Sequence, residues 1–312
     1  MTDPLVVHTS ELRKAYGAVD ALRGLDLAVP AGSIFGFLGR NGAGKTTTLK
    51  VLLGMARPTA GQARVFGLDA TDARASVTIR QRAAFVTEDK DLIEYMTVDE
   101  IVAFTMSFFP HWDRDLEERY RRRFDLRRDQ RVRTLSRGAR SKLALTLALC
   151  RGADLLLLDE PTSGLDPAAA DEVLQAIVSH VAARPLTVLF SSHQLAEVDQ
   201  IADHVAIIDD GRIVACDAPA NLLAALGPEV LELRVEQPER AEHLLVDAGV
   251  APEDILAIGT TVTVVLHEHS GEGLVEMLRE RSFLLRSVTT RRPAFDDVYL
   301  RLTGGRIGTD GQ

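Results

Sequence analysis

Short apolar runs alternate with helical patterns up to about residue 217 of this 312-residue chain. Several of these runs lack polar alternation, which is typical of strands buried on both faces. The order predicts an α/β core, in which helices flank a parallel sheet. The expected strands are Leu25 to Val29, Ile34 to Leu38, Ala83 to Val86, Leu155 to Leu158, Thr187 to Ser191, Val205 to Ile208 and Arg212 to Ala215. The first two are candidates for an antiparallel β flap.

Over about residues 90–150 the pattern turns helical, which predicts a helical insertion in the sheet. Thr97 and Glu100 have the spacing of a capping box that opens the stretch VDEIVAFTMSFF. Asp113 is a candidate cap for a further helix that follows Trp112.

After residue 228 the order changes to strand, helix, strand, strand, helix and strand. These elements are expected at Leu231 to Val235, Glu239 to Ala248, Ile255 to Ile258, Val262 to Leu266, Gly273 to Arg281 and Leu284 to Val288. The βαββαβ order predicts a small ferredoxin-like α+β domain. We therefore expect one domain over 1–220, a second over 228–303 that closes with a helix at Ala294 to Leu302, and a flexible tail over 304–312.

Composition narrows the class of protein. The chain is 46% hydrophobic and 26% charged, the balance of a well-cored globular protein. Its formal net charge of -9 argues against general nucleic-acid binding, so no nucleic-acid partner is expected. The start MTDPLVVHTS lacks signal-peptide features, and no apolar run approaches the roughly 20 residues of a membrane span. We expect a cytosolic chain with Cys150 and Cys216 as buried, reduced thiols.

One segment departs from this acidic average. From Arg119 to Arg133 eight arginines stand against only Asp125 and Asp129. Two interpretations stay open: a solvated helical face, or a surface that meets anionic lipid headgroups or a partner.

Residues 39–47 read GRNGAGKTT and fit the phosphate-binding pattern G-x-x-x-x-G-K-[ST]. They follow the expected strand IFGFL and precede a helical pattern, which is the context in which this motif cradles phosphates. Its glycines let main-chain N–H groups converge on the phosphates, while Lys45 pairs with the β- and γ-phosphates and Thr46 offers its hydroxyl to Mg²⁺. The expected nucleotide-binding residues of this stretch are Gly39, Asn41, Gly42, Gly44, Lys45, Thr46 and Thr47.

Two further stretches place polar residues at strand ends. In LLLLDEP, 155–161, Asp159 emerges from a buried strand and can help to hold Mg²⁺. Glu160 is then positioned to act as the general base that deprotonates the attacking water. His193 follows the expected strand VLFSS, and we assign it a hydrogen bond to the γ-phosphate, with a solvent-facing loop histidine as the alternative.

The stretch TLSRGARSKLALTLALC, 134–150, contains a second possible anion site. Ser136 and Gly138 fall at the start of a helix, where N–H groups and the helix dipole favour an anion. Because the chain already has one complete phosphate grip, one interpretation is that these residues touch the γ-phosphate held by another copy. The other is that Ser136 is a plain N-cap.

Together, GRNGAGKT, LSRGA, LLLLDEP, SGLD and SSH, in this order and spacing, resemble the ATP-binding-cassette (ABC) ATPases over roughly residues 5–217. The resemblance implies a P-loop NTPase cassette with a RecA-like core, an antiparallel β flap and a helical insertion. It also implies a dimer around two ATPs, with Ser136 and Gly138 completing the partner's site. Tyr16 is then expected to stack on adenine, Asp166 to couple the two sites, and His193 to act as the switch histidine.

The chain departs from the family pattern at two places. The usual LSGGQ reads LSRGA, with Arg137 and Ala139 as the changed positions, while the serine and second glycine that touch phosphate remain. Where most cassettes carry a glutamine that links Mg²⁺ to the transmembrane partner, this chain has Glu88, which can bind the metal but adds negative charge there. A plain loop carboxylate is the alternative for Glu88.

The ending PAFDDVYLRLTG makes the chain similar to ATPase subunits of bacterial drug, lantibiotic and acetoin-related ABC exporters. This resemblance implies separate transmembrane permease chains, a homodimeric ATPase and a peripheral location at the cytoplasmic face of the cell membrane. Family members dock a permease helix beside the helical insertion. The aromatic residues of that region are Phe104, Phe108, Phe109 and Trp112, most of which we expect in the core.

One other function competes with the exporter motor, and a second would add to it. A soluble ABC ATPase that acts on ribosomes or DNA is the alternative, although such proteins usually fuse two cassettes or carry coiled-coil or zinc insertions, and this sequence has neither a heptad run nor zinc-spaced cysteines. The C-terminal domain is also a candidate for ligand sensing or dimer stabilisation, in addition to the motor function.

Overall fold

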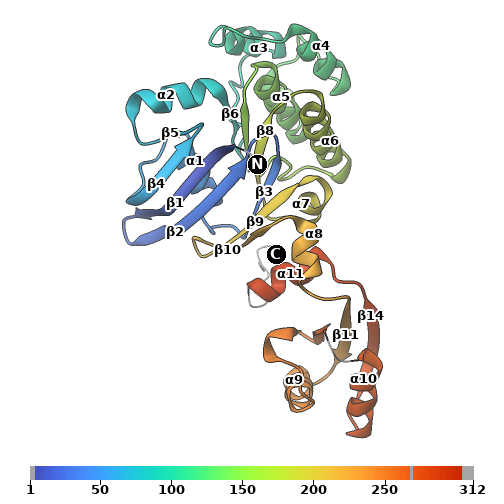
Figure 1. Ribbon diagram of the computed structural model, residues 1–312. Coiled ribbons are helices and arrows are strands. Elements are labelled where there is room, and N and C mark those ends of the chain that lie inside the picture. The colour runs from blue at the N-terminus through green and yellow to red at the C-terminus, as the bar shows by residue number, and fades with distance from the viewer. Residues whose placement is uncertain (1–3, 268–269, 304–312) are drawn as a thin grey trace. The chain divides into compact units, whose positions relative to one another are not determined.

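The computed structural model describes residues 4–267 and 270–303, so the predicted tail over 304–312 lies outside the described residues. The chain divides into two compact units, Met1–Cys216 and Asp217–Gln312 (Figure 1). The first contains the phosphate-binding motif and the second the βαββαβ segment.

A six-stranded sheet is the centre of the first unit. Its order is β10 (Arg212–Asp217), β9 (His204–Asp209), β3 (Ile34–Leu38), β8 (Thr187–Ser192), β7 (Leu155–Asp159) and β6 (Ala83–Val86). The pairs from β9 through β6 are parallel. Every residue of β3, β7 and β8 is buried, as expected for strands covered on both faces. The predicted α/β core is confirmed.

The second sheet is an antiparallel flap. Its order is β2 (Val19–Pro30), β1 (Leu5–Tyr16), β4 (Ala60–Val65) and β5 (Leu68–Asp69). The assignment of Leu25 to Val29 to the flap is confirmed, but that of Ile34 to Leu38 is wrong. Those five residues form β3, which lies in the middle of the parallel sheet because both of its faces are covered.

Helices surround the parallel sheet (Figure 1). α1 (Lys45–Leu52) follows the phosphate-binding loop, and α2 (Ala73–Arg82) precedes β6. α6 (Pro167–Ala183) and α7 (Leu195–Ile201) stand on either side of β8 in the sequence, and α7 contacts β3 and β8.

The predicted helical insertion lies between β6 and β7. It contains α3 (Val98–Met106), α4 (Arg114–Arg123), a 3₁₀ turn η1 (Val132–Thr134) and α5 (Arg137–Cys150). The Thr97–Glu100 capping box is formed at the start of α3. Asp113 caps α4 by accepting a 2.8 Å hydrogen bond from the Leu116 amide, so both predicted caps are confirmed.

The arginine-rich segment forms a salt-bridged, solvated face. Glu118 accepts hydrogen bonds from Arg121, Arg122 and Arg128. Those from Arg121 and Arg122 are the main causes that lower the pKa of the Glu118 carboxyl to about 2. Of the two interpretations, the structure therefore favours a solvated helical face over a cationic surface that is free to bind lipid headgroups or a partner.

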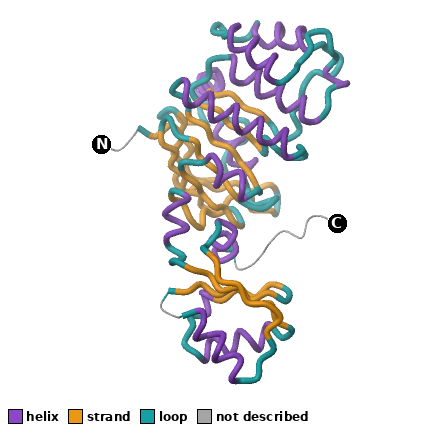
Figure 2. The backbone as a smooth tube through the Cα atoms, turned by 90° about the vertical axis from the view of Figure 1, so that its right-hand side faces the viewer, coloured by secondary structure: helices purple, strands orange, loops and turns teal. Residues whose placement is uncertain are grey.

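The second unit begins with α8 (Pro219–Ala224) and continues with the predicted βαββαβ order. Its elements are β11 (Glu229–Val235), α9 (Pro238–Asp247), η2 (Pro252–Asp254), β12 (Ile255–Ile258), β13 (Thr261–Leu266), α10 (Gly271–Glu280), β14 (Leu285–Arg291) and α11 (Phe295–Leu302). The sheet order is β12-β13-β11-β14, with every neighbouring pair antiparallel, as in a ferredoxin-like fold. α9 and α10 pack on the sheet and enclose a separate apolar core (Figure 2).

The two cysteines differ in environment. Cys150 is fully buried at the end of α5, as predicted, and burial raises the pKa of its thiol. Cys216 is exposed, so the expectation of burial was wrong there. It lies on β10, the edge strand of the parallel sheet, where intermediate and exposed residues alternate.

Candidate functional site

The loop between β3 and α1 is shaped for phosphate. Gly42 and Gly44 have φ of 83° and 111°, which a side chain would disfavour. A Cβ on Gly44 would also lie 2.7 Å from the Ala21 carbonyl oxygen, so the flap approaches the loop closely there. Helix α1 begins directly at Lys45, which aims the N–H groups of its first turn at this loop.

A cavity of about 230 Å³ opens over this loop. It is lined by Ala21, Arg40, Asn41, Gly42, Gly44, Lys45, Thr46, Thr47, Glu88 and Glu160. Tertiary structure therefore brings the phosphate-binding motif together with two carboxylates that lie about 40 and 110 residues further along the chain. Of the predicted loop residues, Gly39 lies just outside this lining and follows β3.

The predicted acidic pair lies at the carboxyl end of β7. Asp159 is 2% exposed and accepts a 2.7 Å hydrogen bond from the Ser191 hydroxyl. The same hydroxyl accepts a 3.0 Å bond from the Glu160 amide. Because Asp159 and Ser191 are register partners of the parallel strands β7 and β8, one serine fixes both acidic residues.

The Glu160 carboxylate contacts two other predicted residues. Its Oε1 lies 3.0 Å from Lys45 Nζ, and its Oε2 lies 2.8 Å from His193 Nδ1. Lys45 Nζ also donates to the carbonyl oxygens of Gly39 and Arg40, at 2.5 and 3.2 Å. The three predicted catalytic residues thus form one connected cluster, in which His193 remains partly accessible to solvent.

Oxygen ligands suitable for Mg²⁺ lie in the same region. Thr46 and Glu88 line the cavity, and Asp159 lies one residue before Glu160. Among the described residues no group of three or more His, Cys, Asp and Glu could hold a metal ion by itself. This donor set fits Mg²⁺, which protein sites commonly bind through one or two carboxylates together with phosphate oxygens and water.

Besides Gly39, four predicted nucleotide-binding residues lie outside the cavity lining. Tyr16 is 49% exposed at the end of β1. Ser136 and Asp166 are exposed, and each caps a helix, by accepting from the Ala139 and Ala169 amides respectively. Gly138 lies against α6, since a Cβ on it would be 3.3 Å from the Ala169 Cβ. The N-cap interpretation of Ser136 is confirmed as geometry, and it is compatible with a phosphate contact to a second copy.

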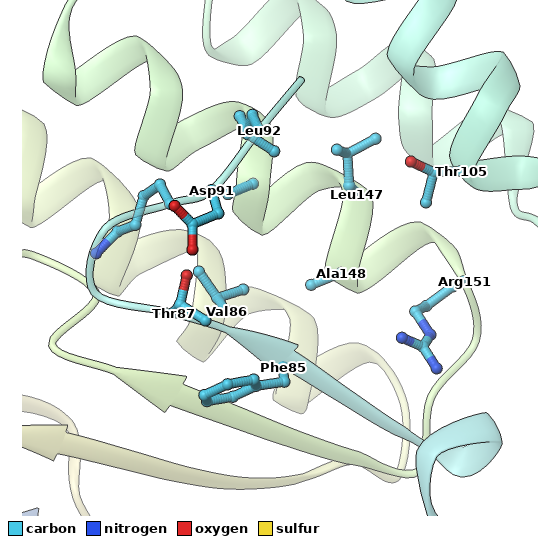
Figure 3. A pocket seen from close by; sticks show the side chains of 11 residues that line it. Phe85, Val86, Thr87, Asp91, Leu92, Thr105, Leu147, Ala148 and Arg151 are labelled. Carbon is cyan, nitrogen blue, oxygen red and sulfur yellow. The ribbon is translucent and has the colours of Figure 1, made fainter. Parts of the chain in front are cut away.

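A second hollow, which we call the insertion groove, lies between the β6–α3 loop and the helical insertion (Figure 3). Its lining includes Val86, Leu92, Thr105, Leu147 and Ala148. In the sequence around Thr105, Phe104 and Phe108 are 43% and 63% exposed, and their rings pack edge to face. Phe109 and Trp112 are only partly buried, so the expectation that most of these aromatic residues lie in the core was wrong.

Known proteins are similar to this chain in sequence and in fold. A model of the ABC transporter family matches residues 22–163. The daunorubicin/doxorubicin resistance ATP-binding protein DrrA of Streptomyces peucetius is 35% identical over 96% of this chain and 92% of its own length. The chain belongs to the ABC transporter ATP-binding proteins. It is also similar to the bacitracin transport ATP-binding protein BcrA of Bacillus licheniformis, 29% identical over 98% of this chain and 99% of that protein.

The Nod factor export ATP-binding protein I of Cupriavidus metallidurans is a further relative, 33% identical over 96% of this chain and 97% of its own length. A solved ATP-binding subunit of an ABC transporter superposes with a TM-score of 0.63 and 27% identity, over 71% of this chain and 93% of that one. The predicted P-loop cassette fold is confirmed. This ABC cassette therefore binds and hydrolyses ATP.

Sequence reasoning missed two residues of the ABC cassette. Ser191 was treated only as part of a strand, although the register of β7 and β8 places it beside Asp159. Lys90 was not considered, yet it is 7% exposed and its Nζ donates to the Glu160 carbonyl oxygen. The sequence offered a signal for Ser191, because a polar residue at the end of a buried strand faces the same edge as the acidic pair. Lys90 stands in a charged run, EDKD, that resembles an ordinary loop.

Proposed function

We propose that this ABC ATPase is the motor subunit of a bacterial exporter, and that two copies clamp two ATPs and drive separate permease chains. The observation that supports a dimer is the position of three residues that the family resemblance assigns to the partner's site or to the coupling of the two sites. Ser136, Gly138 and Asp166 lie outside the chain's own phosphate cavity, so they are available to complete the site of a second copy.

Each residue of the phosphate site has a role in this proposal. Lys45 and the loop N–H groups bind the phosphates, and Tyr16 stacks on adenine. Thr46, Asp159 and Glu88 hold Mg²⁺, which supplies charge stabilisation when bound. Glu160 takes a proton from the attacking water, whose oxygen forms a bond to the γ-phosphorus while the bond to the ADP oxygen breaks. His193 contacts the γ-phosphate and orients the Glu160 carboxylate.

The insertion groove is the proposed docking site for the permease. Apolar residues line part of it, and the helix that contributes Thr105 also exposes Phe104, as a protein interface does. No described helix of the chain is long and apolar enough to cross a membrane. In this proposal the permease holds the chain at the cytoplasmic face of the membrane.

The exporter branch is preferred over action on ribosomes or DNA. DrrA, BcrA and the Nod factor protein carry names that refer to drug resistance, bacitracin transport and Nod factor export. None of these three names refers to ribosomes or nucleic acid. The ribosome and DNA alternative therefore has no support among them.

Copurification tests the permease partner. The tagged chain is extracted from its host in mild detergent, and mass spectrometry is expected to find a stoichiometric multispanning protein. Thr105→Arg, which places a long cation in the groove, is expected to lose that partner. Ala103→Arg, on the same helix but exposed and outside the groove lining, is the matched control and keeps it. Recovery of the chain alone or with ribosomes contradicts the transport function.

The C-terminal unit is proposed to regulate the motor or to stabilise its dimer. It has its own core, and a cavity of about 520 Å³ lies between residues of β12, β13 and α11. Removal of residues 228–312 is expected to change the ATPase rate or the dimer affinity of the purified chain. Unchanged values of both contradict this role.

A further inference from the structure

Lys90 is a buried cation in the loop between β6 and α3. Its side chain is 7% exposed, and its Nζ donates hydrogen bonds to the carbonyl oxygens of Glu160 and Glu88, at 2.8 and 2.9 Å. Burial lowers the pKa of the Lys90 ammonium from its ordinary value, against the opposing effect of the carboxylates of Glu88 and Asp159. Burying a charge and ordering a long side chain both cost free energy, so the hydrogen bonds to its partners must offset that cost.

The main chain at Glu160 is the main partner. Glu160 has φ of 46°, in the left-handed region that residues with a side chain rarely adopt. Its carbonyl oxygen accepts from Lys90 Nζ and, at 3.2 Å, from the Ser163 amide. Its own amide donates to Ser191. Lys90 therefore fixes the carbonyl group of Glu160, and Ser191 fixes its amide. With both ends of its main chain held, the direction in which the Glu160 carboxylate points is set.

Lys90 also connects regions that the sequence keeps apart. It borders the insertion groove, one wall of which is the segment from Val86 to Leu92 that contains Lys90 (Figure 3). It equally borders a cavity of about 570 Å³ that is lined by Arg137 and Ser163. A single side chain thus reaches from the groove to the residue that is proposed as the general base.

We propose that Lys90 is a positioning residue for ATP hydrolysis, which holds the main chain of Glu160 so that its carboxylate meets the attacking water. This inference rests on the proposed role of Glu160. Lys90 acts through Glu160 and not on the phosphates, so its loss reduces the rate of the chemical step and leaves nucleotide binding intact.

Steady-state ATP hydrolysis and equilibrium ATP binding of the purified full chain test this role. The permease is left out because Lys90 borders its proposed docking groove, and a variant that lost the permease would confuse the result. Lys90→Met keeps an unbranched side chain one atom shorter and removes the donor, and we expect kcat to fall at least tenfold while the Kd for ATP changes less than twofold. Lys90→Arg retains a charged donor and is expected to restore kcat to within about threefold of the unmodified chain. Lys90→Gln, too short to reach the carbonyl, behaves like Lys90→Met and is the second variant if the methionine impairs folding.

Lys142→Met is the matched control. Its side chain is 15% exposed and pairs with Glu172 at 2.7 Å, so the same chemical change is made at a partly buried lysine away from Glu160. Normal kcat is expected for this variant. If Lys90→Met and Lys90→Gln keep normal kcat, if ATP affinity falls in step with kcat, or if Lys90→Arg is as slow as Lys90→Met, the positioning role is wrong.

A double variant separates this inference from the proposed function. In a Glu160→Gln background, Lys90→Met is expected to cause no further loss of hydrolysis, because the group it positions is already removed. A further tenfold loss in that background contradicts positioning through Glu160. If Glu160→Gln itself hydrolyses ATP normally, it is the assignment of the base that fails, whatever Lys90 does.

Discussion

Lys45 Nζ lies 3.0 Å from Glu160 Oε1, and both side chains are 5% exposed. The residue proposed to bind the phosphates and the residue proposed to activate water are therefore each other's partner in this structure. A buried charge that loses its partner is costly, so the lysine and the carboxylate stabilise each other here. When ATP binds, its phosphates compete with Glu160 for the same ammonium group.

Glu160→Gln is expected to slow hydrolysis strongly and to strengthen ATP binding. The amide cannot accept the water proton, and its neutral charge neither competes for Lys45 nor repels the γ-phosphate. We expect a loss of at least a hundredfold in phosphate release and about tenfold tighter ATP binding, or ~1.4 kcal/mol. Light scattering in ATP should show a dimer. A variant that stays monomeric with ATP and hydrolyses it normally contradicts the assignment of the base.

Lys45→Ala is expected to weaken the nucleotide grip itself. The change removes the cation that pairs with the phosphates and leaves the Glu160 carboxylate buried beside them, so ATP affinity should fall at least about tenfold. Titration with a fluorescent ATP analogue measures this. Lys50→Ala, an exposed lysine on the same helix α1, is the control and should bind normally. Equal affinities for the two variants rule out the role of Lys45.

Ser136→Asp separates helix capping from phosphate contact. Aspartate is as good an N-cap as serine, so α5 and the melting temperature should be preserved. The added negative charge would face the γ-phosphate of the second copy, and we expect ATP-dependent dimerisation and hydrolysis to be lost. If Ser136→Asp dimerises and hydrolyses ATP like the unmodified chain, Ser136 only caps its helix.

His180 is expected to make the first unit less stable in acid. It is 4% exposed, and burial lowers its pKa from 6.5 to about 4. Between these values the unfolded chain binds a proton that the folded chain does not, so this contribution to stability is complete above about pH 6.5 and declines as the pH falls toward 4. Urea unfolding followed through Trp112, the only tryptophan, measures it.

Two variants check the source of that pH dependence. His180→Gln should flatten the decline of unfolding free energy between pH 6.5 and 4, because the titrating group is gone. His8→Gln, an exposed histidine of the same unit, should leave it unchanged. An identical slope in His180→Gln and the unmodified chain means that other groups cause the acid sensitivity.

Local sequence determined much of this protein. The sequence alone predicted the glycine-rich loop before Lys45, the buried leucine strand before Asp159, and the helix caps at Thr97 and Asp113. These features depend on residues that are close together in the chain. The βαββαβ order of the second unit was readable for the same reason. Family motifs then indicated which nucleotide these elements serve.

Only tertiary structure decided how distant residues meet. The place of Ile34 to Leu38 at the centre of the parallel sheet depends on which strands cover it, and apolar runs of equal length look alike in sequence. The exposure of Phe108 depends on where the helical insertion packs. The contacts of Glu160 with Lys45 and Lys90 join segments 115 and 70 residues apart, and such contacts follow from strand register and loop path, which no local pattern encodes.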